Sequence, residues 1–535
     1  MIRRGSLLLF ILLIASASLA QEPVKAWDGT IDLPTYDWKE DPYPRFWALD
    51  GKIIYPYTME EVISTTKENR TYKALYLEND YLKVTCLPEL GGRIFSVLNK
   101  VTGKEMFHKN KVVKPGLIGM RGAWISGGVE WNTGPHGHTV TAISPVNALV
   151  RQNQDGSATL HISNTEQIFR TRWNVEVTLY PDRSFLHEEM RIFNPEDGIH
   201  PYYFWNCTAF PCGKGTRFIF PMTLGCNHNG DEFFNWPIHE GKDISWLKNY
   251  DKPTSIFAWE CDQDFFGCYD VDLDKGLVQV ADHRALKGKK AWTWGQSDDG
   301  LVSQEGLTDE DGPYIEVQSG PLRTQADYGE LSPREEVAWE EWWYPVYGFD
   351  QGFDFATKDV VFEVKTREGG SLEAIHLLST KPYPGCHLTF EPEGGTAQNF
   401  EVDLSPQEPK EVNLQGGNAM SGKFLLTDST GGSIAEFQYP LPLVEQKAPT
   451  IPKKKDESEM TVEELFAEAL EADRGTSRKR ARELYEKVIA KASDYAEAHF
   501  RLGVLDFESG LWTEAKRKFQ TALDLEPSHS MARYF

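Results

Sequence analysis

The sequence predicts a mainly β protein that ends in an α-helical tail. From Lys73 to Tyr347, apolar and polar residues alternate in short runs separated by turn residues such as Gly, Pro and Asn. After residue 458 the hydrophobic period changes to that of a helix. Many short strands over such a length indicate a large β-sandwich.

Residues 1–20 have the features of a secretory signal peptide. Basic residues precede an apolar run from Leu7 to Ile14, and small residues lead to Ala20. The apolar run is too short to span a bilayer comfortably, so an uncleaved anchor is the less favoured alternative. We therefore expect cleavage after Ala20, a periplasmic or extracellular location, and no membrane span in the mature chain.

Four regions are expected after the cleavage point. The large β-sandwich, with a lead-in rich in Pro and Asp, should occupy residues 21–349. A second, small β-sandwich of immunoglobulin-like size should occupy residues 350–443, where Gly pairs close the strands. Residues 444–458 contain Pro and a charge run, which indicates a linker, and residues 459–535 should form helices.

The tail contains an internal repeat. Small residues and an aromatic residue recur at an interval of 34 residues, as Ala469, Ala481 and Tyr485 and then as Gly503, Ala515 and Phe519. This is the tetratricopeptide (TPR) spacing, in which small residues allow the two helices of a repeat to approach closely. Fewer than three repeats leave an apolar face uncovered. We therefore expect the tail to dock on the body, to bind a protein partner, or to belong to a longer array.

Composition excludes some partners and suggests another. The formal net charge is -24, which argues against nucleic acid or an anionic membrane as the main partner. The seven Cys are spread over a long chain, so a disulfide framework does not hold the fold together, although Cys207 with Cys212, or Cys261 with Cys268, could pair. No CxxC motif is present, so a thiolate zinc site has no support. The 16 Trp and 21 Tyr could stack on sugar faces or fill a β core.

The densest polar cluster is the Gly-rich segment 125–139. It contains Glu130, Trp131, His136 and His138. A His exchanges a proton near neutral pH, and a Glu beside a Trp can acquire a raised pKa. The cluster could therefore bind sugar, supply an acid, or form a structural turn network. A divalent metal ion between the two His is the least favoured reading, because no third ligand follows, so we expect no cofactor.

Three further motifs place hydrogen-bonding groups beside aromatic rings or in a strand. In DGPYIEVQSG, Glu316 and Gln318 point away from the apolar face of the strand, toward a cleft or toward solvent. Asp243 with Trp246, and Lys290 with Trp294, combine polar groups and rings in a way that suits a sugar. Each of these pairs alone is more often structural.

Residues 312–345 resemble the C-terminal part of galactose mutarotases, and residues 87–94 resemble an early strand pair of that family. Glu316 and Gln318 match a Glu and a Gln of its Glu-x-Gln segment. The resemblance implies a mutarotase-like β-supersandwich in which Glu316 is the base on the anomeric hydroxyl.

Residues 70–347 also resemble an uncharacterised family of exported bacterial proteins that join a mutarotase-like domain to TPR repeats. Its hallmark segments are GGVEWNTGPHGH, YYFWN, GKDISWL, GKKAWTWG and DGPYIEVQSG, all of which are present.

The sequence departs from mutarotases at the acid. The acid His of that family stands in a His-x-Tyr-Phe-Asn strand, but in the corresponding segment HPYYFWNCTAFP Asn206 or Cys207 falls about where that His would be. His136 and His138 are the natural substitutes, His228 is a third possibility, and His200 is a weaker one.

These observations favour an exported enzyme that acts on carbohydrate at an anomeric centre. Glycoside hydrolysis is the first choice, with Glu316 as base or nucleophile and Glu130 or His138 as acid. The alternatives are a non-catalytic carbohydrate-binding module whose tail recruits a protein, and an aldose 1-epimerase. The expected substrate contacts are His136, Trp131, Asn206, His228, Asp243, Lys290, Trp294 and Gln318.

Export can be tested directly. Because small residues lead to Ala20, mass spectrometry of the secreted protein should find Gln21, or its cyclised form, at the N-terminus. An intact Met1 in the secreted fraction would contradict the predicted cleavage.

Overall fold

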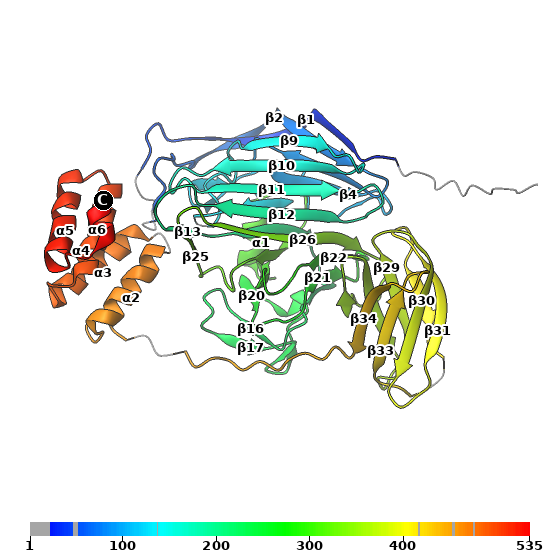
Figure 1. Ribbon diagram of the computed structural model, residues 1–535. Helices are drawn as coiled ribbons and strands as arrows, with labels where there is room; N and C mark the ends of the chain where they lie inside the picture. The colour runs from blue at the N-terminus through cyan, green and yellow to red at the C-terminus, as the bar shows by residue number, and fades with distance from the viewer. Residues whose placement is uncertain (1–21, 46–51, 136, 416–417, 452–454, 475–476) are drawn as a thin grey trace, which may run out of the picture.

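The computed structural model describes residues 22–45, 52–135, 137–415, 418–451, 455–474 and 477–535 (Figure 1). The expected signal peptide lies outside these ranges. No helix within them has the length and hydropathy that are needed to cross a membrane.

Two large antiparallel sheets stack to form the body of the protein (Figure 1). Within the described ranges the first sheet has 12 strands, in the order β1-β2-β3-β4-β8-β14-β24-β23-β20-β16-β17, with β5 beside β4. Its strands are β1 (Lys25–Lys39), β2 (Val62–Glu78), β3 (Leu82–Leu87), β4 (Arg93–Asn99), β5 (Lys104–Glu105), β8 (Val129–Asn132), β14 (Trp205–Pro211), β16 (Leu224–Cys226), β17 (Phe233–Asn235), β20 (Thr254–Ala258), β23 (Gly288–Thr293) and β24 (Tyr314–Gly320).

The second sheet covers one face of the first. In the described part of the chain it has eight strands, in the order β15-β21-β22-β26-β12-β11-β10-β9. They are β9 (Asn147–Gln152), β10 (Ala158–Thr165), β11 (Arg172–Leu179), β12 (Leu186–Phe193), β15 (Thr216–Ile219), β21 (Phe265–Asp270), β22 (Lys275–Val280) and β26 (Glu336–Val346).

The main hydrophobic core lies between these two sheets. Ile315 and Val317 of β24 and Trp343 of β26 are fully buried and belong to it. Because side chains alternate along a strand, the residues between them face the opposite side. The first sheet thus presents one apolar face to the core and leaves its other face available for a site.

The N-terminal region differs from the expected irregular lead-in. β1 and β2 form one long antiparallel ribbon, paired from Lys25 with Glu78 to Lys39 with Val62. Most of their side chains are exposed or half-buried, so they lack the apolar alternation that reveals a strand. Pro34 is tolerated because β1 is an edge strand, where a missing N–H donor costs little.

Short elements connect the large strands. Three two-stranded pairs are β6 (Gly116–Gly119) with β7 (Gly122–Trp124), β13 (His200–Tyr202) with β25 (Gly329–Leu331), and β18 (Ile238–His239) with β19 (Lys242–Asp243). The 3-10 helix η1 covers Leu247–Asn249, and the polar helix α1 covers Asp298–Glu305.

A smaller β-sandwich follows at one end of the body (Figure 1). Two four-stranded sheets, β27-β28-β29-β32 and β31-β30-β33-β34, enclose a separate core that includes Phe362, Leu388 and Phe424. The strands are β27 (Phe355–Ala356), β28 (Val360–Thr366), β29 (Leu372–Ser379), β30 (Tyr383–Pro392), β31 (Gln398–Leu404), β32 (Lys410–Asn413), β33 (Gly422–Thr427) and β34 (Ser433–Tyr439).

The tail forms helical hairpins with the packing that the repeat predicts. A Cβ atom at Gly503 would lie 2.6 Å from the ring of Phe519, so a larger residue there would displace that ring. Ala469, Ala481 and Tyr485 are fully buried in the first hairpin. The helices are α2 (Val462–Arg474), α3 (Arg478–Lys491), α4 (Ala496–Glu508), α5 (Trp512–Leu525) and α6 (Ser530–Tyr534). The predicted fold class, mainly β with an α-helical tail, is confirmed.

Two carboxyl groups face each other inside the main core. Glu188 of β12 and Glu341 of β26 are cross-strand partners, and both are fully buried. Glu341 accepts hydrogen bonds from Asn206, Gln279 and Ser319, whereas the Glu188 carboxyl has no hydrogen-bond partner among the described residues. Burial and the neighbouring Glu341 raise the pKa of Glu188 well above its usual range, and burial raises the pKa of Glu341 to about 7.

This pair should make stability depend on pH. Both carboxyl groups have a higher pKa in the folded protein than in the unfolded chain. The folded protein is therefore most stable when both are protonated, below the unfolded pKa values, and its free energy of unfolding falls as pH rises through about 7. Glu188→Gln removes one acid and offers Glu341 an amide donor. We expect it to raise the free energy of unfolding at about pH 9 by about 1–2 kcal/mol, measured by urea denaturation.

Glu189→Gln is the matched control, because Glu189 follows on the same strand and points to the other face. A wild-type protein whose stability is the same at about pH 6 and about pH 9 would contradict the protonated pair.

Candidate functional site

A cavity of about 240 Å³ lies on the face of the first sheet that turns away from the core. Strands β8, β23 and β24 supply part of its wall, and loops close the rest. Besides Gly137, the lining side chains are Lys52, Ile118, Trp124, Asn132, His138, Tyr203, His228, Lys290, Trp292, Trp294, Glu316, Gln318, Gln325 and Tyr328. The set combines aromatic rings with acid, base and amide groups.

Strand register places the polar groups side by side. Lys290 of β23 lies opposite Gln318 of β24, and Trp292 lies opposite Glu316. All four side chains share the cavity face, because alternate residues such as Ile315 and Val317 point into the core.

A chain of hydrogen bonds runs along this wall. Lys290 Nζ donates to Gln325 Oε1 at 2.5 Å, and Gln325 Nε2 donates to Gln318 Oε1 at 2.7 Å. Gln318 Nε2 in turn donates to Glu316 Oε2 at 2.5 Å. This chain fixes the orientation of the Glu316 carboxyl and leaves Oε1 without a donor among the described residues.

Opposite this wall, a carboxylate supports the imidazole of His138. Glu130 Oε2 lies 2.8 Å from His138 Nδ1 and accepts a hydrogen bond from Trp124 Nε1 at 2.7 Å. Glu130 is 2% exposed and does not line the cavity, whereas the His138 side chain is 23% exposed. Glu130 therefore acts on the cavity through His138.

The electrostatic environment favours a charged imidazole. Burial alone would lower the pKa of His138, but the charge and hydrogen bond of Glu130 outweigh it and raise the pKa. Burial would raise the pKa of Glu130, but His138 and Arg93 lower it instead. Both shifts favour the form in which Glu130 and His138 are an ion pair.

Glu316 experiences the opposite balance. Burial raises its pKa, although Lys290 and His138 act against that rise. A raised pKa makes the Glu316 carboxylate a stronger base than an exposed glutamate. The cavity therefore holds a buried base and an imidazole whose charged form Glu130 favours, within electrostatic reach of each other.

The structure brings six of the predicted site residues into one cavity. Glu316, Gln318, Lys290, Trp294, His138 and His228 all line it. They come from segments that are far apart in the sequence, which strand pairing and two loops unite. His136 lies outside the described residues.

Three residues that were predicted to contact the substrate do not line the cavity, so these predictions are wrong. Trp131 is 1% exposed and packs in the core, with its indole N–H donating to Gly92 O. Asn206 is fully buried and donates to Glu341 on the core side. Asp243 caps a turn by accepting from the backbone N–H and hydroxyl of Ser245.

Cys207 is the residue of β14 that approaches the site. Cys207 pairs with Glu130 of β8, so its side chain points to the cavity side of the sheet, whereas the neighbouring Asn206 points into the core. The ligand atoms of Glu130, His138 and Cys207 lie within 4.8 Å of one another. They fit a metal poorly, because burial raises the pKa of the thiol well above its usual value and Nδ1 of His138 already contacts Glu130.

Several lining residues were missed by the sequence reasoning. Trp292 lies midway between Lys290 and Trp294, so strand alternation alone could have placed it on their face. The same rule favours Asn132 over Trp131, because Asn132 shares the face of Glu130. Lys52, Trp124, Tyr203, Gln325 and Tyr328 come from other segments, and nothing local marks them.

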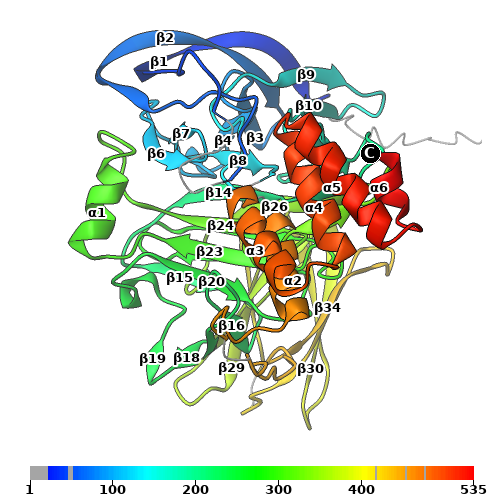
Figure 2. The ribbon, with the colours of Figure 1, turned by 90° about the vertical axis from the view of Figure 1, so that its left-hand side faces the viewer.

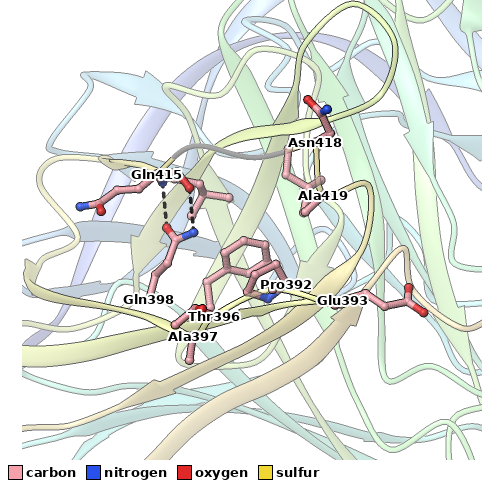
Figure 3. A pocket seen from close by; sticks show the side chains of 13 residues that line it. Pro392, Glu393, Thr396, Ala397, Gln398, Gln415, Asn418 and Ala419 are labelled. Atoms are coloured by element: carbon pink, nitrogen blue, oxygen red, sulfur yellow. Dashed lines mark hydrogen bonds between the residues drawn. The ribbon is translucent and has the colours of Figure 1, made fainter.

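A larger hollow, of about 700 Å³, lies in the small sandwich (Figure 3). Gln398 exchanges two hydrogen bonds with the backbone of Gln415 there, and Glu393 accepts a hydrogen bond from Ser421. The lining has one carboxyl group and no His or Lys, so it offers no acid–base pair. The smaller cavity of the body is therefore the candidate site.

Solved structures match the chain at low identity. A TPR-domain containing protein from Parabacteroides distasonis is 21% identical with a TM-score of 0.58, and the match covers 95% of this chain and 81% of that one. The two proteins therefore share a fold.

Two further matches are more distant. A putative aldose 1-epimerase from Klebsiella pneumoniae is 13% identical with a TM-score of 0.39, covering 61% of this chain and 92% of that one. A galactose mutarotase-like protein from Clostridium acetobutylicum is 11% identical with a TM-score of 0.38, covering 58% and 99%.

A family profile matches more than half of the chain. The matched residues, 49–346, run through the first and second sheets and contain the segments that supply Glu130, His138, Lys290 and Glu316. The chain therefore belongs to the family described as domain of unknown function DUF5107.

Proposed function

We propose that this chain is an exported protein that binds one sugar unit in the cavity and exchanges protons at its anomeric centre. The observation that carries the proposal is the pairing of Glu316 with His138 across a single cavity lined by aromatic rings. Acid and base roles need two titratable groups whose environments differ, and these two differ in charge and in supporting contacts.

The proposed reaction is anomer exchange, as in an aldose 1-epimerase. Glu316 accepts the proton of the anomeric hydroxyl while His138 donates a proton to the ring oxygen. The bond between the anomeric carbon and the ring oxygen breaks, and the anomeric carbon becomes a carbonyl. Rotation of the carbonyl and reversal of the proton transfers close the ring as the other anomer, so no group is consumed.

The geometry favours this reaction over the glycoside hydrolysis that the sequence suggested first. Hydrolysis by the two-carboxylate route needs a second carboxyl group beside the glycosidic bond. Glu130 is the second carboxylate nearby, but it lies behind His138 and its Oε2 is engaged by Trp124 and His138. Glu316 is thus the carboxyl group that reaches the cavity.

Aromatic rings support sugar binding in particular. Trp124, Trp292, Trp294, Tyr203 and Tyr328 line the cavity. Indole and phenol rings can stack on the apolar face of a sugar, and Lys290 and Gln318 can bond its hydroxyls. A volume of about 240 Å³ suits a single sugar unit rather than a larger ligand.

Replacement of the base tests the proposal. Glu316→Gln keeps the shape of the side chain but removes its charge and basicity. We expect anomer exchange of glucose or galactose, followed by polarimetry or NMR exchange, to fall at least about a hundredfold while sugar affinity changes little.

Glu401→Gln, an exposed substitution on the small sandwich, is the control and should leave exchange unchanged. Full activity of Glu316→Gln would show that the base is another residue. A wild-type protein that binds sugars but catalyses no exchange would favour the binding-module alternative.

The pH profile provides a second test. Activity should rise as Glu316 loses its proton above the usual glutamate range, and fall as His138 loses its proton above the usual histidine range. Glu130→Gln removes the charge that raises the pKa of His138. The alkaline limb of the profile, and the His138 titration followed by NMR, should therefore both move to lower pH.

The matched control removes another carboxylate that contacts a histidine. Glu340 lies 2.9 Å from His187 on the second sheet, away from the cavity. Glu340→Gln should leave both limbs in place. An alkaline limb that stays fixed in Glu130→Gln would contradict the role of Glu130 in positioning and charging His138.

A further inference from the structure

A second hollow, of about 380 Å³, adjoins the candidate site. Lys52, His228, Gln325 and Tyr328 line both cavities, so the two share a wall. The outer wall of the second hollow comes from the helical tail. Glu468 and Glu471 of α2 and Arg480 of α3 contribute to it.

The linker carries the tail back along the body to this position. The small sandwich and the tail lie at opposite ends of the body (Figure 1). Between them, Thr223 Oγ1 donates to Val444 O and accepts from Gln446 N, both at 3.0 Å. Gln446 Nε2 also donates to Glu260 O at 3.3 Å. These bonds attach the start of the linker to the body.

A buried cation attaches the tail itself. The Arg478 guanidinium lies 5.2 Å from the centre of the Phe169 ring of the body. Arg478 is 7% exposed and pairs with Asp473 and Glu508 inside the tail. A desolvated cation over a ring is worth more than an exposed one, so this contact can hold the first helical hairpin against the body (Figure 2).

The tail wall has the chemistry of a sugar-binding surface. Glu468 and Glu471 are three residues apart on α2 and therefore lie on one face of the helix. Carboxylates accept hydrogen bonds from hydroxyl groups, and the Tyr328 ring across the hollow can stack on a sugar. Arg480 is already paired with Glu457 and Glu483, so the wall favours a neutral sugar over a uronic acid.

We propose that the helical tail completes a second sugar subsite, so that the protein takes a saccharide of at least two neutral units. The reducing-end unit occupies the inner cavity, and the next unit lies between the body and α2. This inference rests on the proposed function of the inner cavity. It also gives the docked tail a role in substrate selection.

Calorimetric binding to the full-length chain tests the second subsite. The probes are glucose against maltose, cellobiose and lactose, which all carry glucose at the reducing end, and galactose against galactobiose. We expect at least one disaccharide to bind about tenfold or more tightly than its monosaccharide, because hydrogen bonds to charged groups are strong. Digalacturonate should show no gain over galacturonate.

Substitutions on α2 test whether the tail causes the tighter binding of the disaccharide. Glu468→Gln combined with Glu471→Gln should reduce the disaccharide preference to about twofold or less and leave monosaccharide affinity unchanged. Glu471→Gln alone, on an exposed residue, should give a partial loss with no effect on folding. Glu514→Gln on α5 is the matched control, because Glu514 is exposed on the tail and lies outside the hollow.

The outcomes separate the two proposals. Equal affinity for mono- and disaccharides, or a preference that survives in the double variant, overturns the tail subsite and leaves the inner site intact. A preference for digalacturonate overturns the charge argument and with it the neutral-saccharide assignment. Absence of binding to every probe overturns the proposed function, and the tail subsite with it.

Discussion

Alternation of side chains along β8, β14, β23 and β24 is the constraint on which the candidate site depends. Each of these strands sits in the middle of the first sheet, with the second sheet covering one of its faces. Residues on the covered face must be apolar or fully hydrogen-bonded, since an unpaired polar group costs free energy there. The other face is then available for Glu316, Gln318 and Lys290, and the rigid ladder fixes their spacing.

The cost of burying these groups is offset by charges of alternating sign. Arg93 is 2% exposed beneath the site, and its charge stabilises the Glu130 and Glu316 carboxylates. Its Nη1 atom donates to Gly127 O, whereas Nε and Nη2 have no hydrogen-bond partner among the described residues, and burial lowers the pKa of Arg93 despite the neighbouring carboxylates. Such an arrangement is worth little for stability but holds the charged groups of the site in fixed positions.

Sequence patterns predicted the fold class because period two and period 3.6 are local properties. The same local rule correctly put Glu316 and Gln318 on the polar face of their strand. The rule also places Trp131 on the core face, so the aromatic character of this residue alone is a misleading guide to a sugar contact. β1 and the first part of β2 were not predicted, because both faces of the ribbon are largely exposed there and the sequence shows no alternation of apolar and polar residues.

The remaining site residues could not be predicted locally, because their positions depend on long-range closure. Gln325 and Tyr328 reach the cavity from the loop between β24 and β25, and Trp124 reaches it from β7. None of the three has a sequence neighbourhood that differs from that of a core or loop residue. Trp124 ends a strand of the separate pair β6–β7, and Gln325 and Tyr328 lie in a loop, so their positions depend on how these connections fold over the first sheet. A single sequence contains no measure of that folding.

For the helical tail, the sequence predicts the repeat but not the surface against which the repeat packs. The 34-residue spacing of small and aromatic residues identifies the repeat. It contains no information on which surface covers the helix face that lacks a neighbouring repeat. Two hairpins bury little area alone, so contact with the body adds to the stability of the first hairpin. Arg478 over Phe169 and the bonded linker supply that contact. Arg478 begins α3, which also supplies Arg480 to the second hollow, so the helix that contacts the body also forms part of the wall of that hollow.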